Sequence, residues 1–204
     1  MAKLSGLIVT AALLLSIPAA LPAQSLTWTI DPGHSAAQFS VRHMVVSNVK
    51  GQFDGPTGTV TFDSRDVPGT LKVEASIDTK TINTRNPDRD KDLRSELFFD
   101  VEKFPTITFK SKRAEAAASG RFNVIGDLTM HGVTKEVKLE VEGPTPAITD
   151  IWGNSRIGAT ATTTVNRRDF GLLYNRVLET GGAVVGSEVT ITIDLELTRQ
   201  PSKE

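Results

Sequence analysis

Short segments in which apolar and polar residues alternate dominate the chain after about residue 25. In "SEVTITIDLELT", residues 187–198, every second side chain is apolar and those between are polar. A period of two predicts a strand with one dry face and one solvated face. The dry faces predicted in this way are Val189, Ile191, Ile193, Leu195 and Leu197 here, Leu71, Val73, Ala75 and Ile77 in "TLKVEASID", and Val137, Leu139 and Val141 in "KEVKLEVE".

Seven further segments are candidate strands. They are "LTWTID", "AQFSVRH", "KGQFD", "GTVTFD", "PTITFKSKRAE", "GRFNVIGDLTMHG" and "IGATATTTVNR". Allowing for strands that break or bend, about eight long ones remain, and a twisted sheet of that size closes into a barrel to remove its edges. We therefore predict an all-β fold, an eight-stranded antiparallel barrel. Two Trp and one Tyr cannot form the aromatic girdles of an outer-membrane barrel, so the dry face should point inward.

One short helix is expected, in "RNPDRDKDLRSEL". Asn86 suits the N-cap position, and acidic residues follow where the helix dipole favours them. Leu93 and Leu97 lie four residues apart and would form a narrow apolar stripe. Asp90 and Arg94 have the spacing of an i, i+4 ion pair.

The first 23 residues have the composition of a secretory signal peptide. Lys3 precedes an apolar run that is broken by Pro18 and followed by small residues up to Ala23. Its removal from 204 residues leaves 181, enough for one domain over residues 24–204. The formal net charge of -1 provides no basic surface for nucleic acid. The lack of Cys excludes disulfides and Cys chemistry.

Motifs for catalysis are weak. Asp88, Asp90 and Asp92 have the first spacings of a calcium loop, but its sixth and twelfth positions are occupied by Leu93 and Phe99, so the motif fails. No nucleotide-binding glycine loop and no GxSxG elbow occurs. We predict a protein that is not an enzyme, with no catalytic residue, no metal and no cofactor. The alternative is a metal-dependent enzyme that uses His34, His43 and His131, whose spacings are not those of a metal site.

The segment "GATATTTV" bears on the barrel interior. Its residues are small on both faces, so this strand contributes little volume to the interior. Eight strands enclose a space that is just filled by side chains or holds one small ligand. Periodicity alone leaves open whether bulky neighbours fill the gap.

Several segments in this order resemble the YceI-like family. They are "WTIDPGHSAAQFSVRHM", "VKGQFDGPTGTVTFD", "ASIDTKTINTRNPDRDKDLRSELFFDVEKFPTITFKS", "VIGDLTMHGVTKEVKLEVE" and "NRRDFGL". The resemblance implies a lipocalin-like extended barrel, exported to the periplasm, that binds a polyisoprenoid, a quinone-type or a similar long-chain lipid in a tunnel. It implies no established catalysis, no stable membrane insertion, and subunits that can pair as a homodimer. In one departure, Asp92 stands where many members have His.

The motifs provide the candidate ligand-binding residues. These are Phe39, Val41, Phe53, Phe98, Phe99, Ile107, Phe109, Leu128, Phe170, His34, His43, Arg94 and His131. Phe98 and Phe99 are adjacent, and because neighbours in an extended chain point to opposite sides, at most one should face the lumen. In the following strand, Ile107 and Phe109 should point inward. Arg94, with Arg85 and Arg89, either meets a polar head group or pairs with nearby carboxylates.

The leading hypothesis is therefore a periplasmic protein that holds or carries a long amphiphilic lipid. Besides the metal-dependent enzyme, a stress-response partner protein with a filled barrel is the remaining alternative.

Overall fold

The computed structural model describes residues 25–177, 179 and 183–200, and the predicted signal peptide lies outside them. Its strands are β1 (Leu26–Ile30), β2 (Ala36–His43), β3 (Ser47–Phe53), β4 (Thr57–Phe62), β5 (Lys72–Asp78), β6 (Thr106–Ala116), β7 (Phe122–Met130), β8 (Val133–Glu142), β9 (Ile148–Thr149), β10 (Ser155–Asn166) and β11 (Val185–Arg199). Its helices are α1 (Val67–Thr70) and α2 (Pro87–Arg94), with the 3-10 turns η1 (Thr79–Thr81), η2 (Ala118–Gly120) and η3 (Arg167–Phe170).

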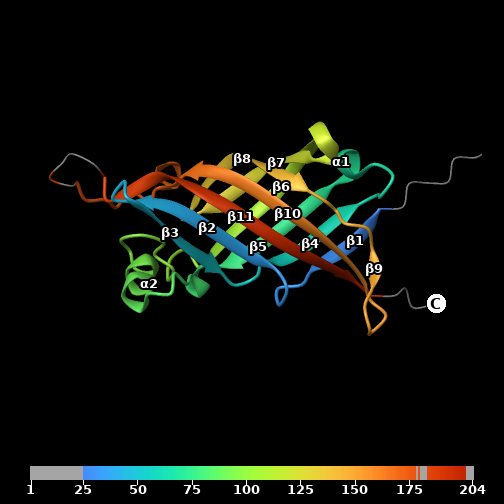
Figure 1. Cartoon of the computed structure of the whole chain (residues 1–204), viewed down its shortest axis with the longest axis horizontal. Helices are drawn as coiled ribbons and strands as arrows, with labels where there is room; N and C mark the ends of the chain where they lie inside the picture. The colour runs from blue at the N-terminus through green and yellow to red at the C-terminus, as the bar shows by residue number, and fades with distance from the viewer. Residues whose placement is uncertain (1–24, 178, 180–182, 201–204) are drawn as a thin grey trace, which may run out of the picture.

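The strands form a closed antiparallel barrel, as predicted. Hydrogen bonding runs β11–β1–β4–β5–β6–β7–β8–β10, and β10 pairs with β11 to complete a ring of eight strands. The closing ladder is long, from Ser155 opposite Arg199 to Asn166 opposite Glu188. Figure 1 shows an elongated barrel with strands inclined to its long axis. Closure leaves no exposed edge in this ring.

β1 and β2 behave as one strand that is broken at a corner. β1 pairs with the last residues of β11, at Leu197 and Thr198, whereas β2 pairs with its first ten. β3 and β4 likewise behave as one strand that is broken at a corner, because β3 pairs with β2 and β4 pairs with β1. The two corners touch, and a Cβ on Gly55 would lie 2.1 Å from the carbonyl oxygen of Pro32. The chain therefore requires glycine at this corner.

The two ends of the barrel differ. At the end near β9, which we call the β9 end, Trp28 stacks on Phe62 with ring centroids 6.3 Å apart. The buried residues Ile30, Val60, Ile157 and Leu197 complete this cluster and fill the β9 end. The opposite end carries α2, η3 and the start of β11, and we call it the α2 end (Figure 1).

Helix α2 begins where the sequence predicts and ends earlier than predicted. The Asn86 side chain accepts a hydrogen bond from the Arg89 N–H, and Pro87 occupies the first helical turn. The helix stops at Arg94, so the predicted Leu93–Leu97 stripe is wrong. Leu93 packs toward the core, whereas Leu97 is 51% exposed.

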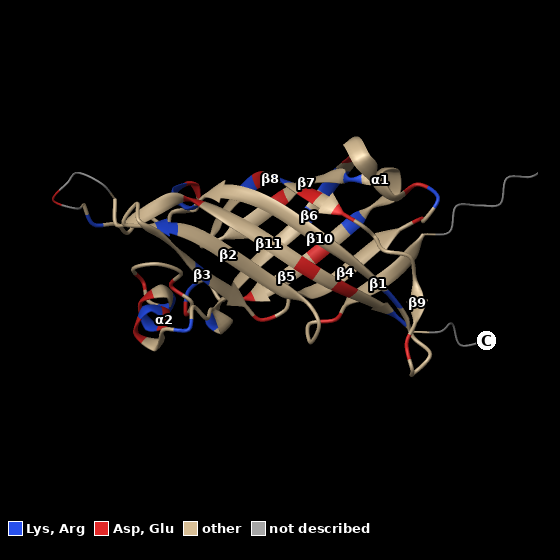
Figure 2. Ribbon diagram, viewed as in Figure 1, with Lys and Arg blue, Asp and Glu red and all other residues tan. Residues whose placement is uncertain are grey.

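Charged residues occur along the strands and are concentrated in α2 (Figure 2), and most of those on the strands are exposed. The alternation read from the sequence explains this arrangement, because polar positions of each strand face solvent. Within the described residues, no helix has the length and apolar character needed to cross a membrane.

Candidate ligand-binding cavity

An apolar cavity of about 200 Å³ lies inside the barrel. Its wall receives side chains from seven of the eight ring strands, among them Ile30, Val73, Leu139 and Ile193, and from β2, for example Ala37. On β11 the wall runs from Val185 to Leu195, a span of eleven residues and roughly 33 Å along the strand. The cavity therefore follows the long axis of the barrel.

The dry faces predicted by alternation form much of this wall. From β11, β5 and β8 the residues in the wall are Val189, Ile191, Ile193 and Leu195, then Val73, Ala75 and Ile77, and then Val137 and Leu139. Ala161 and Thr163 of β10 lie opposite Ile193 and Ile191 and also border the cavity. These small side chains leave space that a longer residue would fill. The segment "GATATTTV" thus helps to keep the interior open, and the alternative of a filled barrel is wrong.

Two aromatic rings lie along the wall because each covers a glycine of the neighbouring strand. Phe39 is the cross-strand partner of Gly51, and a Cβ on Gly51 would lie 2.4 Å from its ring. Phe109 of β6 lies diagonally across from Gly126 of β7, and a Cβ on Gly126 would lie 2.6 Å from its ring and 2.5 Å from the carbonyl oxygen of Lys110. A side chain at either glycine would displace the ring, so the glycines allow the rings to stay close to the sheet.

The chain between β5 and β6, residues 79–105, adds the wall at the α2 end. Leu93, Phe98 and Phe99 all border the cavity. The Phe99 ring packs edge-on against Phe53, with centroids 5.7 Å apart, and Phe98 lies 4.9 Å from Tyr174. The expectation that only one of Phe98 and Phe99 faces the lumen is wrong. These residues lie in a turn, where the alternation of an extended strand does not apply.

Eight of the residues predicted from the motifs border the cavity. They are Phe39, Val41, Phe53, Phe98, Phe99, Ile107, Phe109 and Leu128. The inward orientation of Ile107 and Phe109 is therefore confirmed. The structure does not place Phe170, His34, His43, Arg94 or His131 in this wall.

Arg94 holds together the chain between β5 and β6, residues 79–105, which we call the α2 segment. Its Nε donates to the carbonyl of Lys80 at 2.8 Å and its Nη2 to that of Ile82 at 2.7 Å. The predicted Asp90–Arg94 pair is wrong, because buried Asp90 instead accepts hydrogen bonds from the backbone N–H and hydroxyl of Thr84. Arg89 also donates to Thr84. Within the described residues, neither arginine forms an ion pair with a carboxylate of the helix.

His131 and Phe170 support the α2 end from outside the cavity. Nδ1 of His131 lies 3.3 Å from the carbonyl oxygen of Phe170, and the imidazole packs against the Phe104 ring at 4.5 Å. Phe170 is 2% exposed and belongs to the core cluster at this end. Both residues position η3 beside the turn between β7 and β8. His43 is the last residue of β2 and lies opposite Val185.

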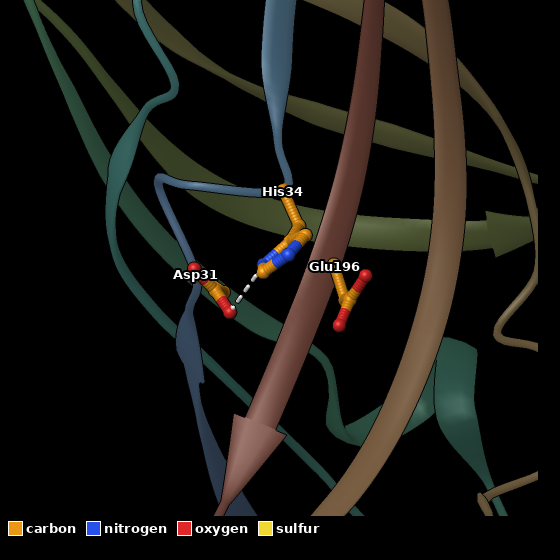
Figure 3. A group of neighbouring side chains, drawn as sticks. All are labelled: Asp31, His34 and Glu196. Carbon is orange, nitrogen blue, oxygen red and sulfur yellow. Dashed lines mark hydrogen bonds and ion pairs between the residues drawn. The ribbon is translucent and has the colours of Figure 1, made fainter. Parts of the chain in front are cut away.

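His34, His43 and His131 do not come together in a metal site. The structure therefore contradicts the alternative in which these three histidines bind a catalytic metal. Among the described residues, the group of potential ligands whose atoms lie within 4.8 Å of one another is Asp31, His34 and Glu196 (Figure 3). His34 Nδ1 is 2.9 Å from Asp31 Oδ2. The guanidinium of Arg156 donates to both carboxylates and therefore already supplies their positive partner.

Arg156 also binds Asp150, at 2.7 Å from Nε to Oδ2. Burial opposes ionisation of Asp150, but hydrogen bonds from Arg156 and Asn154 prevail and lower its pKa to about 2. The pKa of Asp31 is lowered by His34 and by Arg156. This network ties β10 to β11 and to the corner after β1, on the outside of the barrel.

Arg167 is a charged wall residue that the sequence reasoning missed. It is 4% exposed and borders the cavity at the α2 end. Burial lowers the pKa of its guanidinium, and the neighbouring charge of Arg168 lowers it further. The signal was present in the sequence, because Arg167 continues the inward series Ala161, Thr163 and Val165 by one more step of two.

Residues 28–197 match the model of the YceI-like domain, and the chain belongs to this family. One relative is UPF0312 protein SAS2572 of Staphylococcus aureus strain MSSA476. It is 36% identical over 171 residues, which cover 84% of this chain and 96% of the relative.

Solved structures share the fold. Burkholderia cenocepacia BcnA matches with a TM-score of 0.68 and 20% identity, over 82% of this chain and 98% of BcnA. A Campylobacter jejuni YceI protein matches with a TM-score of 0.64 and 26% identity, over 78% and 90% of the two chains. A polyisoprenoid-binding domain from Saccharophagus degradans matches with a TM-score of 0.58 and 16% identity, over 85% and 98%.

Proposed function

We propose that this protein binds a long-chain amphiphilic lipid, a polyisoprenoid, quinone or similar molecule, inside its barrel and carries or stores it in the periplasm. The observation that supports this most is the apolar cavity, which follows the barrel axis and is bordered by side chains from seven of the eight ring strands. The family fold supports a lipid-binding role, and the neighbour from Saccharophagus degradans is a polyisoprenoid-binding domain. The predicted signal peptide supports export.

The lining favours hydrocarbon over a polar ligand. Each CH₂ group moved from water into such a site contributes about 0.8 kcal/mol. Ten methylene-sized groups would contribute about 8 kcal/mol before the costs of association are subtracted. A polar ligand would lose hydrogen bonds to water and find few partners along this wall.

The volume limits how a long chain binds. Small-molecule pockets usually enclose roughly 300–1,000 Å³, whereas this cavity has about 200 Å³. A short prenyl chain would need little rearrangement. A longer one would need wall side chains to move outward, and we expect the α2 end to provide that movement.

The test is to purify the protein from its native host and analyse an organic-solvent extract by mass spectrometry. We expect one class of long-chain lipid in amounts close to the molar amount of protein. Lipid-stripped protein is then titrated with farnesol, a neutral prenyl chain, and with a hydrophilic alcohol of low molecular weight as control. We expect saturable binding of farnesol alone.

Repeated extracts without lipid, together with no binding of farnesol, would contradict the proposal. Binding that survives substitution of the wall but is lost on substitution of the outer surface would place the ligand outside the barrel and also contradict it.

A further inference from the structure

Large apolar side chains are exposed on two neighbouring segments of the α2 end. The Met44 N–H, in the turn between β2 and β3, donates to the carbonyl of Val184 at 2.8 Å, and the Val184 N–H donates to that of Arg176 at 2.9 Å. The turn and the chain before β11 therefore lie side by side (Figure 1). The exposed residues, which we call the apolar tip, are Met44, Val45 and Val46 in the turn and Leu173 and Val177 in the chain before β11.

The turn carries these side chains at a conformational cost. The Val46 N–H closes it by donating to the carbonyl of His43 at 3.0 Å, and the residues between them, Met44 and Val45, have φ of 48° and 61°. Turns with positive φ at both central residues favour Asn and Gly, and a β-branched residue is an outlier there. The turn therefore loses stability in order to expose apolar surface. Exposed apolar patches on soluble proteins mark contact sites with other proteins or with membranes.

Basic residues without acidic neighbours flank the turn. The hairpin of β2 and β3, residues 36–53, contains Arg42 and Lys50 and no Asp or Glu. The Arg42 guanidinium donates to the carbonyl of Val45 at 2.8 Å, which holds its charge beside the apolar tip.

The chain before β11 adds a further cation. Arg176 is exposed, and Glu179 is the one carboxylate among the residues that the structure describes between 171 and 187. In the described part of the chain, no ion pair involves Arg176, Arg42 or Lys50. The apolar tip is therefore surrounded by positive charge that the protein does not neutralise, and this charge complements an anionic surface.

The apolar tip is continuous with the cavity wall. Val185 borders the cavity and is the cross-strand partner of His43, the residue before the tip. The opposite, β9 end is filled by the cluster that contains Trp28 and Phe62. A hydrocarbon chain that enters or leaves the barrel at the α2 end would therefore pass beside the tip.

We propose that the apolar tip docks on the surface of an anionic phospholipid bilayer. Its aliphatic side chains enter the boundary between head groups and acyl chains, and Arg42 and Arg176 lie at the level of the phosphates. Apolar burial and attraction to anionic lipids add together in such peripheral binding. The inference goes beyond the proposed function, because it concerns the surface on which the protein acts and not the content of its barrel.

The test measures co-sedimentation with large vesicles, made either from equimolar phosphatidylglycerol and phosphatidylcholine or from phosphatidylcholine alone. The protein is purified from its native host, and its mass is checked first, because an uncleaved apolar run at the N-terminus would bind vesicles by itself. The wild type should bind the anionic vesicles roughly 25-fold more tightly, about fivefold for each of the two arginines. This preference should shrink as NaCl is added, because salt screens the attraction.

The variant Met44→Asn with Val45→Gly removes two apolar side chains and supplies the residues that the turn favours. Its binding to anionic vesicles should fall at least tenfold, while the midpoint of its urea unfolding should rise. Arg176→Gln should bind them about fivefold more weakly. The matched control is Ile151→Ser with Trp152→Ser, which removes two exposed apolar side chains at the β9 end and should bind as the wild type does.

Three results would overturn the inference: no sedimentation of the wild type with anionic vesicles, unchanged binding in the tip variant, or equal losses in the tip variant and the β9-end control. A wild type that ignores vesicles but forms dimers that the tip variant does not form would assign the tip to a second copy of the chain instead. Farnesol titration of the same proteins tests the proposed function separately. A wild type that binds vesicles and no farnesol would contradict the proposed function and leave the docking surface intact.

Discussion

Replacing Ala161 with leucine should stabilise the ligand-free protein and weaken ligand binding. Ala161 is 5% exposed, borders the cavity, and lies between Val141 on β8 and Ile193 on β11. Leucine adds three carbon atoms. At ~30 Å³ each, the volume of a water molecule in the liquid, they need less room than the cavity of about 200 Å³ provides.

The two effects follow from the same added carbons. Burial of three CH₂-sized groups contributes about 2.4 kcal/mol, and ordering the leucine side chain removes about 0.5–1 kcal/mol. The free energy of unfolding should therefore rise by about 1.5 kcal/mol. A ligand loses contact space for about three methylenes, so its affinity should fall by about 2.4 kcal/mol, roughly 50-fold.

Urea unfolding of the lipid-stripped protein measures the first effect, and titration with farnesol measures the second. Thr162→Leu is the control, because Thr162 lies on the same strand, points outward and is exposed. It should leave farnesol affinity unchanged. The reasoning is refuted if Ala161→Leu binds farnesol as the wild type does, or if it lowers stability by more than about 1 kcal/mol, the sign of overpacking.

Three further predictions concern the wall and its supports. Gly51→Ala should push the Phe39 ring, which an added Cβ would meet at 2.4 Å, into the lumen and weaken farnesol binding by about fivefold, the effect of one displaced CH₂ or slightly more. Gly158→Ala, whose added Cβ would have its nearest neighbour at 3.6 Å, should bind normally in the same titration. Asp90→Ala should lower the free energy of unfolding, measured with urea, by about 3 kcal/mol, because it leaves the buried Thr84 N–H without its acceptor. Asp88→Ala, on the exposed side of the helix, should lower it by less than about 1 kcal/mol. Similar losses in the two variants would contradict this role of Asp90. Because the pKa of Asp150 is about 2 when folded against an ordinary 3.8, its contribution to stability is complete above about pH 4 and is lost as the pH falls toward 2. Urea unfolding between pH 2 and 5 should show a shallower pH dependence for Asp150→Asn than for the wild type or Asp88→Asn, and parallel curves would exclude this contribution.

The strands and their inward faces could be predicted from the sequence because burial on one face imposes a strict period of two. The dry set of β11 from Val189 to Leu197, for example, is read directly from "SEVTITIDLELT". The short helix could be predicted from its cap and proline, because these act within one turn.

The α2 segment was less predictable because its contacts are not local. Phe98 and Phe99 both face the lumen since the chain turns at Ser95, and no period in the sequence indicates that turn. Asp90 bonds to Thr84, outside the helix, in preference to Arg94 one turn away. The role of Arg167 was missed for a different reason, since a charged residue that continues an apolar series is normally taken as the end of the strand.

The hydrogen bonding of the cavity wall indicates which part of it can move to make room for a longer lipid chain. Continuous ladders hold the strands of the ring together, so widening it there would break many hydrogen bonds. The α2 segment is bound to β3 by the Gln52–Asn83 bridge and by the Asp54 N–H bond to Thr81, while its other polar contacts, including those of Arg94 and Asp90, are largely internal. An outward shift of this segment costs the ring contacts that Phe98, Phe99 and Phe104 make with Tyr174, Phe53 and His131. It also costs the packing of Ile82 and Leu93 against the core. A bound tail would replace those apolar contacts with its own, which makes outward displacement of this segment the least costly route to a larger cavity.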